Sequence, residues 1–531
     1  MLRKAALKIN RRTSQAQQLI SNQRTNNKIK ELDDLASVLG QEKSQGKKVV
    51  MCHGVFDLLH IGHIRHFEAA RNFGDILVVT ITPDRFVNKG PGRPVFDEGL
   101  RAEAIAALGC VDYVAVNRWP ISVETIQLLR PDFYVKGSDY SDPDDDRSGG
   151  IILEENAVKS VGGSIKFTDD ITSSSSYLIN RHLPVFSDAV KEFVAGFTAK
   201  HSSGEVFGYL ERAQQMRVLV LGETIIDEYV YCQTLGKSGK EPVLATKQLD
   251  TELFAGGIVA VANHMAAFCN RIGLLSFLGS VDSYEDFVRE NLRAGIESTF
   301  LYLEDGAPTI LKRRFVESYP FQKLFELYVM NGGEPNPAET QALCSELEML
   351  LPQYDMVLVT DYGHGMIGPE AVDLLCDKSK FLAINTQANA GNLGFNTVSK
   401  YHKADFVCVS ENEIRLDARS RRKDLREIVR DVSERLSCRR IIVTRGQNGC
   451  LCYGEDEGFF EMPALADRVV DRIGAGDAVF SAASVCAAQG APIEIVGLVG
   501  NIAGAGAVAT MGHRSSTDSA SLIKHIETLM K

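Results

Sequence analysis

Short apolar runs alternate with helical patterns along most of this chain, and this alternation limits its fold more than any other feature. In the first half the apolar runs are 47–52, 75–81, 111–116, 133–135 and 164–167. Helical patterns at 61–71 and 100–108 separate the first three runs. Buried strands that alternate with helices form parallel sheets covered on both faces. We therefore predict a doubly wound α/β domain over 47–182.

The same alternation starts again in the second half. Residues 183–215 show a mostly helical pattern, and we interpret them as a linker. A new apolar run begins at 217–222, and others follow at 356–360, 381–384, 406–409 and 441–444. The chain has 531 residues, more than one hydrophobic core usually supports. We predict a second domain over 216–531, giving two doubly wound, three-layer α/β domains in series.

Residues 1–46 form a basic leader and a helical lead-in. Positions 1–30 contain several Lys and Arg and no Asp or Glu. A transit peptide can have this composition, but we expect a basic helix or a flexible tail. No apolar run reaches the roughly 20 residues of a membrane-spanning helix, and the eleven cysteines form no CxxC pair. We expect a cytoplasmic protein with reduced cysteines and no membrane partner.

The formal net charge of -11 leaves no broad basic surface for nucleic acid. A nucleotidyltransferase that acts on nucleic acid is an alternative that only the basic leader encourages, so we expect no nucleic-acid partner. Net charge says nothing about a single pocket. A local cationic site for a phosphorylated small molecule is therefore compatible with this charge.

The segment HGVFDLLHIGH, residues 53–63, leaves the first predicted strand and enters a helix. A glycine lets the backbone approach a phosphate, and a helix start offers N–H groups without partners. His60 and His63 can donate hydrogen bonds to charge that develops on an α-phosphate. The other interpretation is two ordinary surface histidines, which the preceding strand and Gly-x-Phe-Asp turn disfavour.

This segment resembles the HxGH signature of the nucleotidylyltransferase superfamily, within its cytidylyltransferase-like group. KGPGRPV at 89–95 is similar to its basic phosphate loop, and ITSSS at 171–175 to its Ser/Thr-rich helix start. PDFYVKGSDY at 131–140 resembles the PDxxVKGxDY segment of the ADP-heptose synthase branch. The resemblance implies catalytic roles for His60, His63 and Lys136. It implies nucleotide contacts at Gly54, Phe56, Lys89, Arg93, Arg101, Ser173 and Ser174.

Asp57 is a candidate substrate contact, and its other interpretation is a cap of the helix or turn. Nucleotidyl transfer needs no protein nucleophile, because the substrate phosphate attacks the α-phosphorus directly. Catalysis then consists of positioning and charge neutralisation, with Mg²⁺ as cofactor. The VKGxDY resemblance favours ATP as the nucleotide, with CTP as the alternative.

A second motif places two glycines and an aspartate before the helical run 478–489. Exposed N–H groups at a Gly-rich helix start form an anion hole. Asp477 beside it can take a proton from an attacking sugar hydroxyl during phosphoryl transfer. The other interpretation is an aspartate that only caps its helix.

The surrounding sequence, about 216–518, resembles ribokinase-type (PfkB) sugar kinases. DRIGAGD at 471–477 is similar to their DTGAGD signature, and GETIID at 222–227 to their opening strand. AGG at 255–257, TDYGHG at 360–365 and TRGQNG at 444–449 match further motifs. The resemblance implies a Rossmann-like domain with a small β lid, formed from parts of 228–250 and 309–330.

The same resemblance assigns residue roles. Asp477 is the catalytic base, and Glu413 in SENE at 410–413 is linked with Mg²⁺. Nucleotide contacts for ATP are implied at Thr444, Gly446, Gly449, Gly474, Ala475 and Gly476. Substrate contacts are implied at Asp227, Gly256, Gly257, Asn263 and Asp361.

Some positions depart from the family pattern. Ala260 stands where Asn is usual, Ile473 replaces Thr, and the residues at 385–387 are Asn-Thr-Gln where heptose kinases have a DPK-like segment. None of these changes removes Asp477 or the anion hole.

The two motifs together resemble the bifunctional enzymes that make ADP-heptose, with the domain order reversed. We predict a bifunctional transferase, a carbohydrate kinase and nucleotidylyltransferase, acting on a heptose-like sugar, a sugar phosphate and nucleoside triphosphates. By analogy we expect a homo-oligomer. The alternative is an active transferase with a degenerate kinase-like domain that binds sugar and regulates or scaffolds it; Ala260 and Asn385 favour this alternative.

Overall fold

The computed structural model describes residues 27–87, 93–137, 150–168, 186–304, 306–319, 321–331, 336–466 and 468–530. These residues form two compact units, whose main parts are 27–186 and 187–522. No helix in the described ranges is long and apolar enough to cross a membrane.

The first unit is built on a five-stranded sheet whose neighbouring strands are parallel. In sheet order the strands are β3 (Tyr113–Val116), β2 (Ile76–Ile81), β1 (Val49–Gly54), β4 (Phe133–Gly137) and β5 (Ser164–Thr168). The chain moves outward from β1 to β3, returns to β4 on the other side of β1, and so creates a topological switch point between β1 and β4. The predicted doubly wound sheet is confirmed.

Helices cover both faces of this sheet. One face carries α2 (Leu32–Ser44), α5 (Val123–Leu129) and α6 (Gly150–Ser160), and the other carries α3 (Ile61–Arg71) and α4 (Glu98–Ala106), with the short η1 (Asp84–Phe86) after β2. The apolar run of β1 serves both cores: Val49 and Met51 belong to the first, Val50 and Cys52 to the second. Because side chains of a strand alternate between faces, a strand covered on both sides needs a continuous apolar run.

The second unit contains a nine-stranded sheet, parallel from β10 to β16 and antiparallel at its last two strands. In sheet order the strands are β10 (Ile296–Tyr302), β9 (Arg271–Leu278), β6 (Arg217–Gly222), β13 (Met356–Asp361), β14 (Leu382–Thr386), β15 (Phe406–Ser410), β16 (Arg440–Thr444), β17 (Cys450–Gly454) and β18 (Gly458–Met462).

The helices of this part of the chain are α8 (Asp188–Thr198), α9 (Ser203–Ala213), α10 (Ile258–Met265), α11 (Glu285–Asn291), α12 (Pro337–Leu350), α13 (Pro369–Lys378), α14 (Glu411–Asp417), α15 (Leu425–Leu436), α16 (Ala475–Ala488), α17 (Ile493–Val508) and α18 (Ser519–Met530), with short η3 (Leu351–Gln353), η4 (Val398–Lys400) and η5 (Gly446–Asn448). Helices α8 and α9 occupy the stretch interpreted as a linker, and they belong to the second unit.

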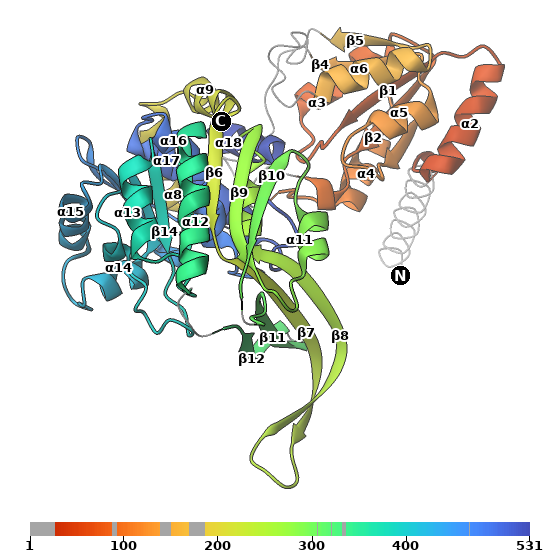
Figure 1. Ribbon diagram of the computed structural model, residues 1–531. Helices are drawn as coiled ribbons and strands as arrows, with labels where there is room; N and C mark the ends of the chain where they lie inside the picture. Colours follow the sequence, from red (N-terminus) through yellow and green to blue (C-terminus); the bar gives the residue numbers. More distant parts are fainter. Residues whose placement is uncertain are drawn as a thin grey trace, which may run out of the picture. The chain divides into compact units, whose positions relative to one another are not determined.

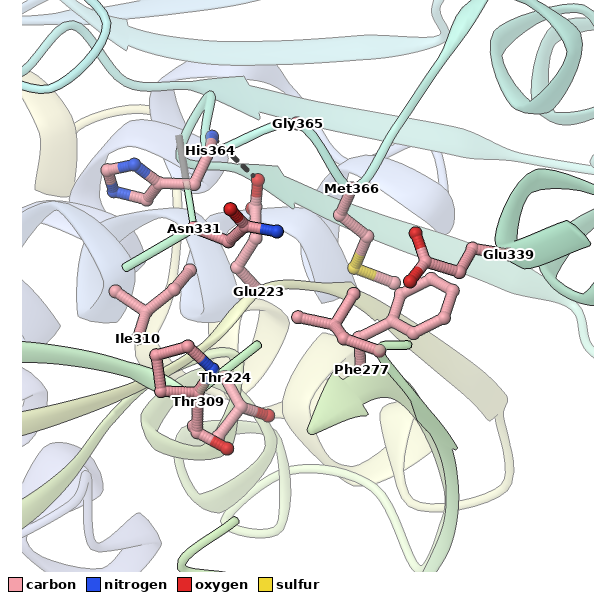
Figure 2. Close-up of a pocket in the computed structure, with 12 residues that line it drawn as sticks. Glu223, Thr224, Phe277, Thr309, Ile310, Asn331, Glu339, His364, Gly365 and Met366 are labelled. Atoms are coloured by element: carbon pink, nitrogen blue, oxygen red, sulfur yellow. Dashed lines mark hydrogen bonds between the residues drawn. The ribbon is translucent and has the colours of Figure 1, made fainter. Parts of the chain in front are cut away.

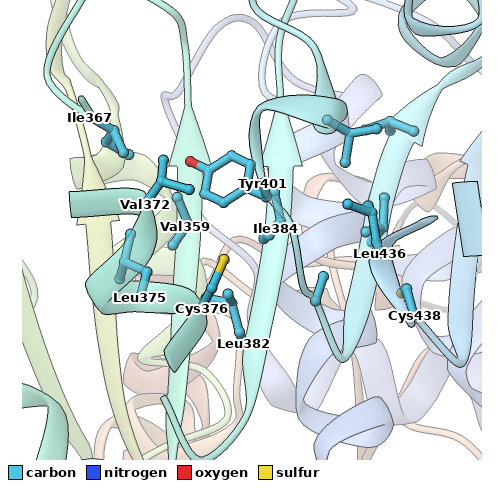
Figure 3. Packing of buried hydrophobic residues seen from close by; sticks show 14 of the residues in the cluster. Val359, Ile367, Val372, Leu375, Cys376, Leu382, Ile384, Tyr401, Leu436 and Cys438 are labelled. Atoms are coloured by element: carbon cyan, nitrogen blue, oxygen red, sulfur yellow. The ribbon is translucent and has the colours of Figure 1, made fainter. Parts of the chain in front are cut away.

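The nine-stranded sheet also has a core on each face. Helices α12, α13 and α15 cover one face (Figure 1). Helices α10, α16 and α17 cover the other. Figure 3 shows part of the first core, where Val359 of β13 and Ile384 of β14 lie with Val372, Leu375 and Leu436 from the covering helices. This arrangement confirms the second doubly wound domain.

A smaller sheet of four strands forms the lid, in the order β12 (Phe321–Val329), β11 (Ile310–Ser318), β7 (Thr224–Lys237) and β8 (Leu244–Gly257). The predicted lid is confirmed, and it begins earlier than 228, because β7 starts directly after β6. Strands β7 and β8 form a long hairpin (Figure 1).

Small side chains bring α16 and α17 close together. A β-carbon on Gly504 would lie 2.6 Å from a methyl carbon of Val479, and one on Gly500 would lie 3.2 Å from the β-carbon of Ala483. Helix α16 is buried along almost its whole length, which is typical of a helix that is apolar on all sides. This packing fixes the position of its first turn.

Candidate active sites

The first candidate site lies at the switch point of the first sheet. Strand β1 ends in His53 and Gly54, and the neighbouring β4 ends in Lys136 and Gly137. In doubly wound sheets, ligands bind at the carboxyl ends of the strands beside the switch point. Nδ1 of His53 lies 2.9 Å from the Thr80 hydroxyl, and desolvation lowers the pKa of His53 to about 4. His53 is therefore neutral near pH 7.

The two motif histidines meet at the start of α3. His60 is the N-cap of this helix, and its Nδ1 accepts a hydrogen bond from Gly62 N at 3.1 Å. The rings of His60 and His63 stack, with centroids 4.0 Å apart and planes at 29°. Burial lowers the pKa of His60. Because Nδ1 is an acceptor here, the neutral His60 ring carries its proton on Nε2 and can donate it to an anion at the helix start.

Phe56 supports this pair from the turn before the helix. Its ring meets His63 edge-on, with centroids 5.3 Å apart. Phe56 has a φ of 48°, a conformation that is uncommon outside glycine. A β-carbon on Gly54 would lie 2.9 Å from the Phe56 ring. The glycine at this motif position thus gives the ring its space.

Asp57 holds the same turn to the chain at 93–96. Its Oδ1 accepts hydrogen bonds from Val95 N at 2.6 Å and Phe96 N at 3.2 Å. Its Oδ2 lies 3.7 Å from Nη1 of Arg93, and both side chains of this ion pair are almost fully buried. Asp57, predicted to contact substrate, and Arg93, predicted to contact nucleotide, therefore form an ion pair with each other.

Lys136 belongs to a buried polar network. Its Nζ lies 2.8 Å from Oε2 of Glu154 on α6, and the Ser122 hydroxyl donates to Oε1 of Glu154 at 2.6 Å. Burial acts to raise the pKa of Glu154, but the charge of Lys136 lowers it overall. The ion pair keeps the Lys136 charge at the carboxyl end of β4, beside the switch point.

Arg101 ties together the loops around this site. Its guanidinium donates to the carbonyl oxygens of Val55 at 2.5 Å and Thr82 at 2.9 Å, and to the carboxylate of Asp84 at 2.5 Å. These bonds give Arg101 a positioning role for the turn after β1. The other predicted nucleotide contacts, Lys89, Ser173 and Ser174, lie outside the described residues.

The second candidate site lies at the start of α16. Gly474 is the N-cap and has a φ of 79°, which favours glycine. N–H groups in the first turn of a helix have no partner within that helix, so the backbone of Gly474, Ala475 and Gly476 offers donors to an anion. Asp477 lies in the same turn, is 5% exposed, and accepts a hydrogen bond from Nε2 of Gln387 at 3.1 Å.

The environment of Asp477 suits proton transfer. Burial raises its pKa to about 6, and the carboxylates of Asp227 and Glu413 act in the same direction. The charge of His513 opposes them. Near neutral pH the carboxylate is therefore mostly ionised and close to its titration range, as a general base requires.

Asp227 on β7 is bonded by two cationic side chains. Nη1 of Arg314 donates to its Oδ1, and Nε2 of His513 lies 3.4 Å from its Oδ2. Burial acts to raise the pKa of Asp227, but the His513 hydrogen bond and the Arg314 charge lower it to about 2. A β-carbon on Gly256 would lie 2.2 Å from Oδ2, so only glycine lets β8 pass this carboxylate.

Two other predicted substrate residues lie at the start of α10 and within it. Gly257 is the N-cap of α10 and has a φ of 56°. Asn263 uses both ends of its amide on nearby backbone, donating to Asn291 O at 2.8 Å and accepting from Arg293 N at 2.9 Å. Asn263 thereby fixes the turn after α11.

Asp361, at the end of β13, is fully buried. Its Oδ2 accepts hydrogen bonds from Nζ of Lys400 at 2.7 Å and from the Tyr401 hydroxyl at 2.9 Å. Its Oδ1 accepts from Gly363 N at 3.1 Å. This predicted substrate residue therefore holds the loop that follows its own strand.

Glu223, which directly follows β6, also bonds to the loop after β13. Its carboxylate accepts hydrogen bonds from Tyr362 N and His364 N, both at 3.0 Å, and Figure 2 shows the second of them. Burial and the charge of Asp361 raise the pKa of Glu223 to about 7. Glu223 and His364 line a cavity of about 50 Å³ between the loop and the start of β11.

Glu413 lies in a capping box at the start of α14. Its Oε2 accepts from Ser410 N at 2.7 Å and its Oε1 from Ala388 N at 3.1 Å. No cluster of three potential metal ligands occurs among the residues that the structure describes. Mg²⁺ usually needs only one or two carboxylates besides nucleotide phosphates. The Asp477 carboxylate, in the first turn of α16, is one candidate of this kind. Both oxygens of Glu413 already accept backbone hydrogen bonds.

The TRGQNG segment forms a tight turn after β16. Arg445 N donates to Gly449 O at 2.8 Å, and Gly446 and Gly449 have φ values of 56° and 75°. A β-carbon on Gly449 would lie 1.8 Å from Met462 O. The turn therefore requires its glycines, and Thr444 is the last residue of the strand before it.

Three residues of the second site were not predicted from the sequence: Arg314, Gln387 and His513. Gln387 lies in the segment that departs from the family pattern, and this departure was the available signal. Arg314 and His513 lie outside every motif, and only the folded chain brings them to Asp227.

Comparison with known proteins covers both units. Residues 215–520 match the pfkB family of carbohydrate kinases, and residues 51–181 match the cytidylyltransferase-like family. The first match covers more than half of the chain.

The transferase part is similar to proteins called bifunctional protein HldE. The chain is 42% identical over 154 residues to HldE of Citrifermentans bemidjiense, which covers 29% of this chain and 30% of that protein. It is 36% identical over 164 residues to HldE of Geobacter metallireducens, covering 30% of this chain and 32% of that protein. The chain thus spans about a third of the length of the curated relatives it matches.

Solved structures of sugar kinases are also similar. Ribokinase from Thermotoga maritima is 18% identical with a TM-score of 0.47, covering 59% of this chain and 99% of that one. Phosphofructokinase-2 from Escherichia coli is 15% identical with a TM-score of 0.49, covering 60% of this chain and 100% of that one. From the family match, the chain belongs to the pfkB family of carbohydrate kinases and carries a cytidylyltransferase-like domain ahead of its kinase domain.

Proposed function

We propose that this chain is a bifunctional enzyme, a carbohydrate kinase joined to a nucleotidylyltransferase. The kinase transfers the γ-phosphoryl group of ATP to a heptose-like sugar, and the transferase couples a sugar phosphate to ATP or CTP and releases pyrophosphate. The observation that carries the proposal is Asp477, a buried carboxylate with a pKa of about 6 in the first turn of a Gly-rich helix start.

In the kinase step, Asp477 accepts the proton of the attacking sugar hydroxyl. The N–H groups of Gly474 to Gly476 hold the phosphoryl group in place and stabilise its charge. Mg²⁺, when bound with the nucleotide, adds charge neutralisation. Asp227 lies beside this helix start, close enough for its charge to raise the pKa of Asp477, and orients the groups that surround the sugar.

In the transferase step, His60 and His63 donate hydrogen bonds to the α-phosphate as the sugar phosphate attacks it. Their stacked rings at the N-terminus of α3 support this role. Lys136 supplies positive charge from the end of β4, across the switch point from β1, the strand that leads to the two histidines. No protein nucleophile is required, because the sugar phosphate oxygen forms the new bond.

A pyrophosphate-release assay tests the transferase. The purified full chain is incubated with Mg²⁺, each of ATP, CTP, GTP and UTP, and a panel of sugar phosphates. We expect one productive pair, lost in His63→Ala and kept in His402→Ala, which changes a half-exposed histidine of the second unit. Nucleotide binding without release in any combination would contradict the proposed reaction.

A second candidate function is a transferase whose kinase-like domain only binds sugar. One observation favours it: both carboxylate oxygens of Asp227 are already engaged by Arg314 and His513. Under this alternative, Asp477→Asn leaves every catalysed rate unchanged, and sugar binding alters the rate of pyrophosphate release. Phosphorylation of any sugar that requires Asp477 would rule it out.

A further inference from the structure

His513 lies beside Asp227 and the start of α16, and the inference drawn from it rests on the proposed kinase function. Gly512 N donates to Oδ2 of Asp471 at 3.2 Å, which fixes the loop after α17 beside the start of α16. The His513 side chain is only 7% exposed, and its Nε2 lies 3.4 Å from Oδ2 of Asp227. Nε2 of the ring therefore faces the carboxylate of Asp227, a predicted substrate contact.

The other edge of the ring lies against the helix start. A β-carbon on Gly474 would lie 2.7 Å from Cε1 and 2.9 Å from Nδ1 of His513. Nδ1 is thus next to the backbone that is expected to bind the transferred phosphoryl group. The imidazole lies between Asp227 on one side and the N-terminus of α16 on the other.

Charged or titratable groups from four elements surround this ring. They are Asp227 on β7, Arg314 on β11, Asp477 on α16 and His264 on α10. Burial acts to lower the pKa of His513 and Arg314 opposes its charge, but Asp227 and Asp477 raise the pKa overall. Burial lowers the pKa of His264 to about 3, so His264 adds no positive charge near pH 7.

We propose that His513 is a catalytic residue of the kinase, whose Nδ1–H donates a hydrogen bond to the γ-phosphoryl group at the start of α16. In the step, the sugar oxygen forms a bond to the γ-phosphorus and the bond to the β–γ bridging oxygen breaks. ADP leaves, and the hydroxyl proton passes to Asp477. His513 keeps its proton throughout. An imidazolium donates from both nitrogens, so His513 holds Asp227 and the phosphoryl group at once.

Nucleotide binding to the full chain tests this role without knowledge of the sugar. Affinities for ADP and for the non-hydrolysable analogue β,γ-imido-ATP are measured with Mg²⁺ by calorimetry for wild type, His513→Ala and His513→Gln. We expect His513→Ala to weaken the analogue by about tenfold, since a hydrogen bond to a charged group is lost. ADP affinity stays unchanged. His513→Gln, which keeps an N–H donor without the charge, loses less.

Arg514→Ala is the matched control. Arg514 is the next residue, but its guanidinium pairs with Glu252 at 2.6 Å on an exposed surface. We expect this variant to bind both nucleotides as the wild type does. Equal affinities of wild type and His513→Ala for the analogue, or an equal loss for both nucleotides, would overturn the role of His513. A wild-type chain that binds neither nucleotide would instead overturn the proposed kinase function.

A second measurement tests the same contact without a His513 substitution, in case His513→Ala does not fold. In a His60→Ala, His63→Ala chain with ¹⁵N-labelled histidine, which lacks the two histidines expected to contact nucleotide at the first site, one imidazolium signal moves when β,γ-imido-ATP is added and stays in place when ADP is added. If no signal distinguishes the two nucleotides, His513 does not contact the γ-phosphoryl group.

Discussion

Single residues of the kinase pocket show how environment assigns chemical roles. Arg314 and His513 keep the pKa of Asp227 at about 2 against the effect of burial, while burial raises the pKa of Asp477 to about 6. Titratable pairs whose environments separate their pKa values divide the roles between them. Asp227 therefore stays charged and holds its partners, and Asp477 exchanges the proton.

The pH dependence of phosphorylation follows from Asp477. A general base works only when it is ionised, so the rate falls as the pH drops through about 6. Measurement of kcat from about pH 5 to about pH 8 checks this. Asp477→Asn lowers kcat by at least about 100-fold. A wild-type rate that does not change with pH in this range would contradict the assignment.

Two glycines of one motif are predicted to respond oppositely to alanine. Gly474→Ala lowers the melting temperature, because its φ of 79° strains an alanine and the β-carbon meets His513 at 2.7 Å. Gly476→Ala meets no atom within 4 Å in α16, and it raises stability by about 0.5 to 1 kcal/mol, since alanine favours a helix. The melting temperatures of both variants, measured by thermal unfolding, test this difference. Two variants of equal stability would contradict the geometry at Gly474.

Separate elements differ in how far the sequence predicts them. Strand β6 was expected at 217–222 and helix α3 at 61–71, and both are found with these bounds. Their signals are local: an apolar run that is covered on both faces, or a helical period after a turn. The lid strands were expected only as approximate ranges, because strands covered on one face carry a weaker pattern.

Contacts between elements could not be predicted in the same way. Arg314 and Asp227 are 87 residues apart and meet only because β11 pairs with β7 in parallel register. His513 reaches Asp227 through the loop after α17, which carries no motif. Motifs gave the candidates Asp57 and Glu413 but not their bonds, since the backbone N–H groups that occupy these carboxylates come from the folded loops.

Strand β11 supplies a matched pair of arginines for a stability test. Arg314 pairs with buried Asp227, whereas Arg313, on the opposite face, pairs with Glu228 and is partly exposed. Removing one partner of a buried ion pair costs several kcal/mol, and His513 still offsets part of the Asp227 charge, so Arg314→Met lowers the free energy of unfolding by about 3 kcal/mol. Arg313→Met lowers it by less than about 1 kcal/mol. Urea unfolding measures both, and equal losses would place Asp227 in a wetter environment than the structure shows.

The whole molecule combines two units, each with its own sheet and cores. His60, His63 and Lys136 all belong to the first, and Asp227, Asp477 and His513 to the second. The net charge of -11 predicts no broad basic surface and carries no information about single pockets. The second unit does concentrate cations locally, at Arg314 and His513 around Asp227.

We propose that the two sites of this chain act independently of each other. The most direct measurement records both reactions on the same preparations of wild type, His63→Ala and Asp477→Asn: phosphate transfer from γ-labelled ATP to sugar, and pyrophosphate release from nucleotide and sugar phosphate. We predict that His63→Ala loses pyrophosphate release by about 100-fold and keeps phosphorylation, since the lost donor acts only on the α-phosphate. Asp477→Asn does the reverse. A wild type that performs only one reaction, or a folded single variant that loses both, would contradict the claim.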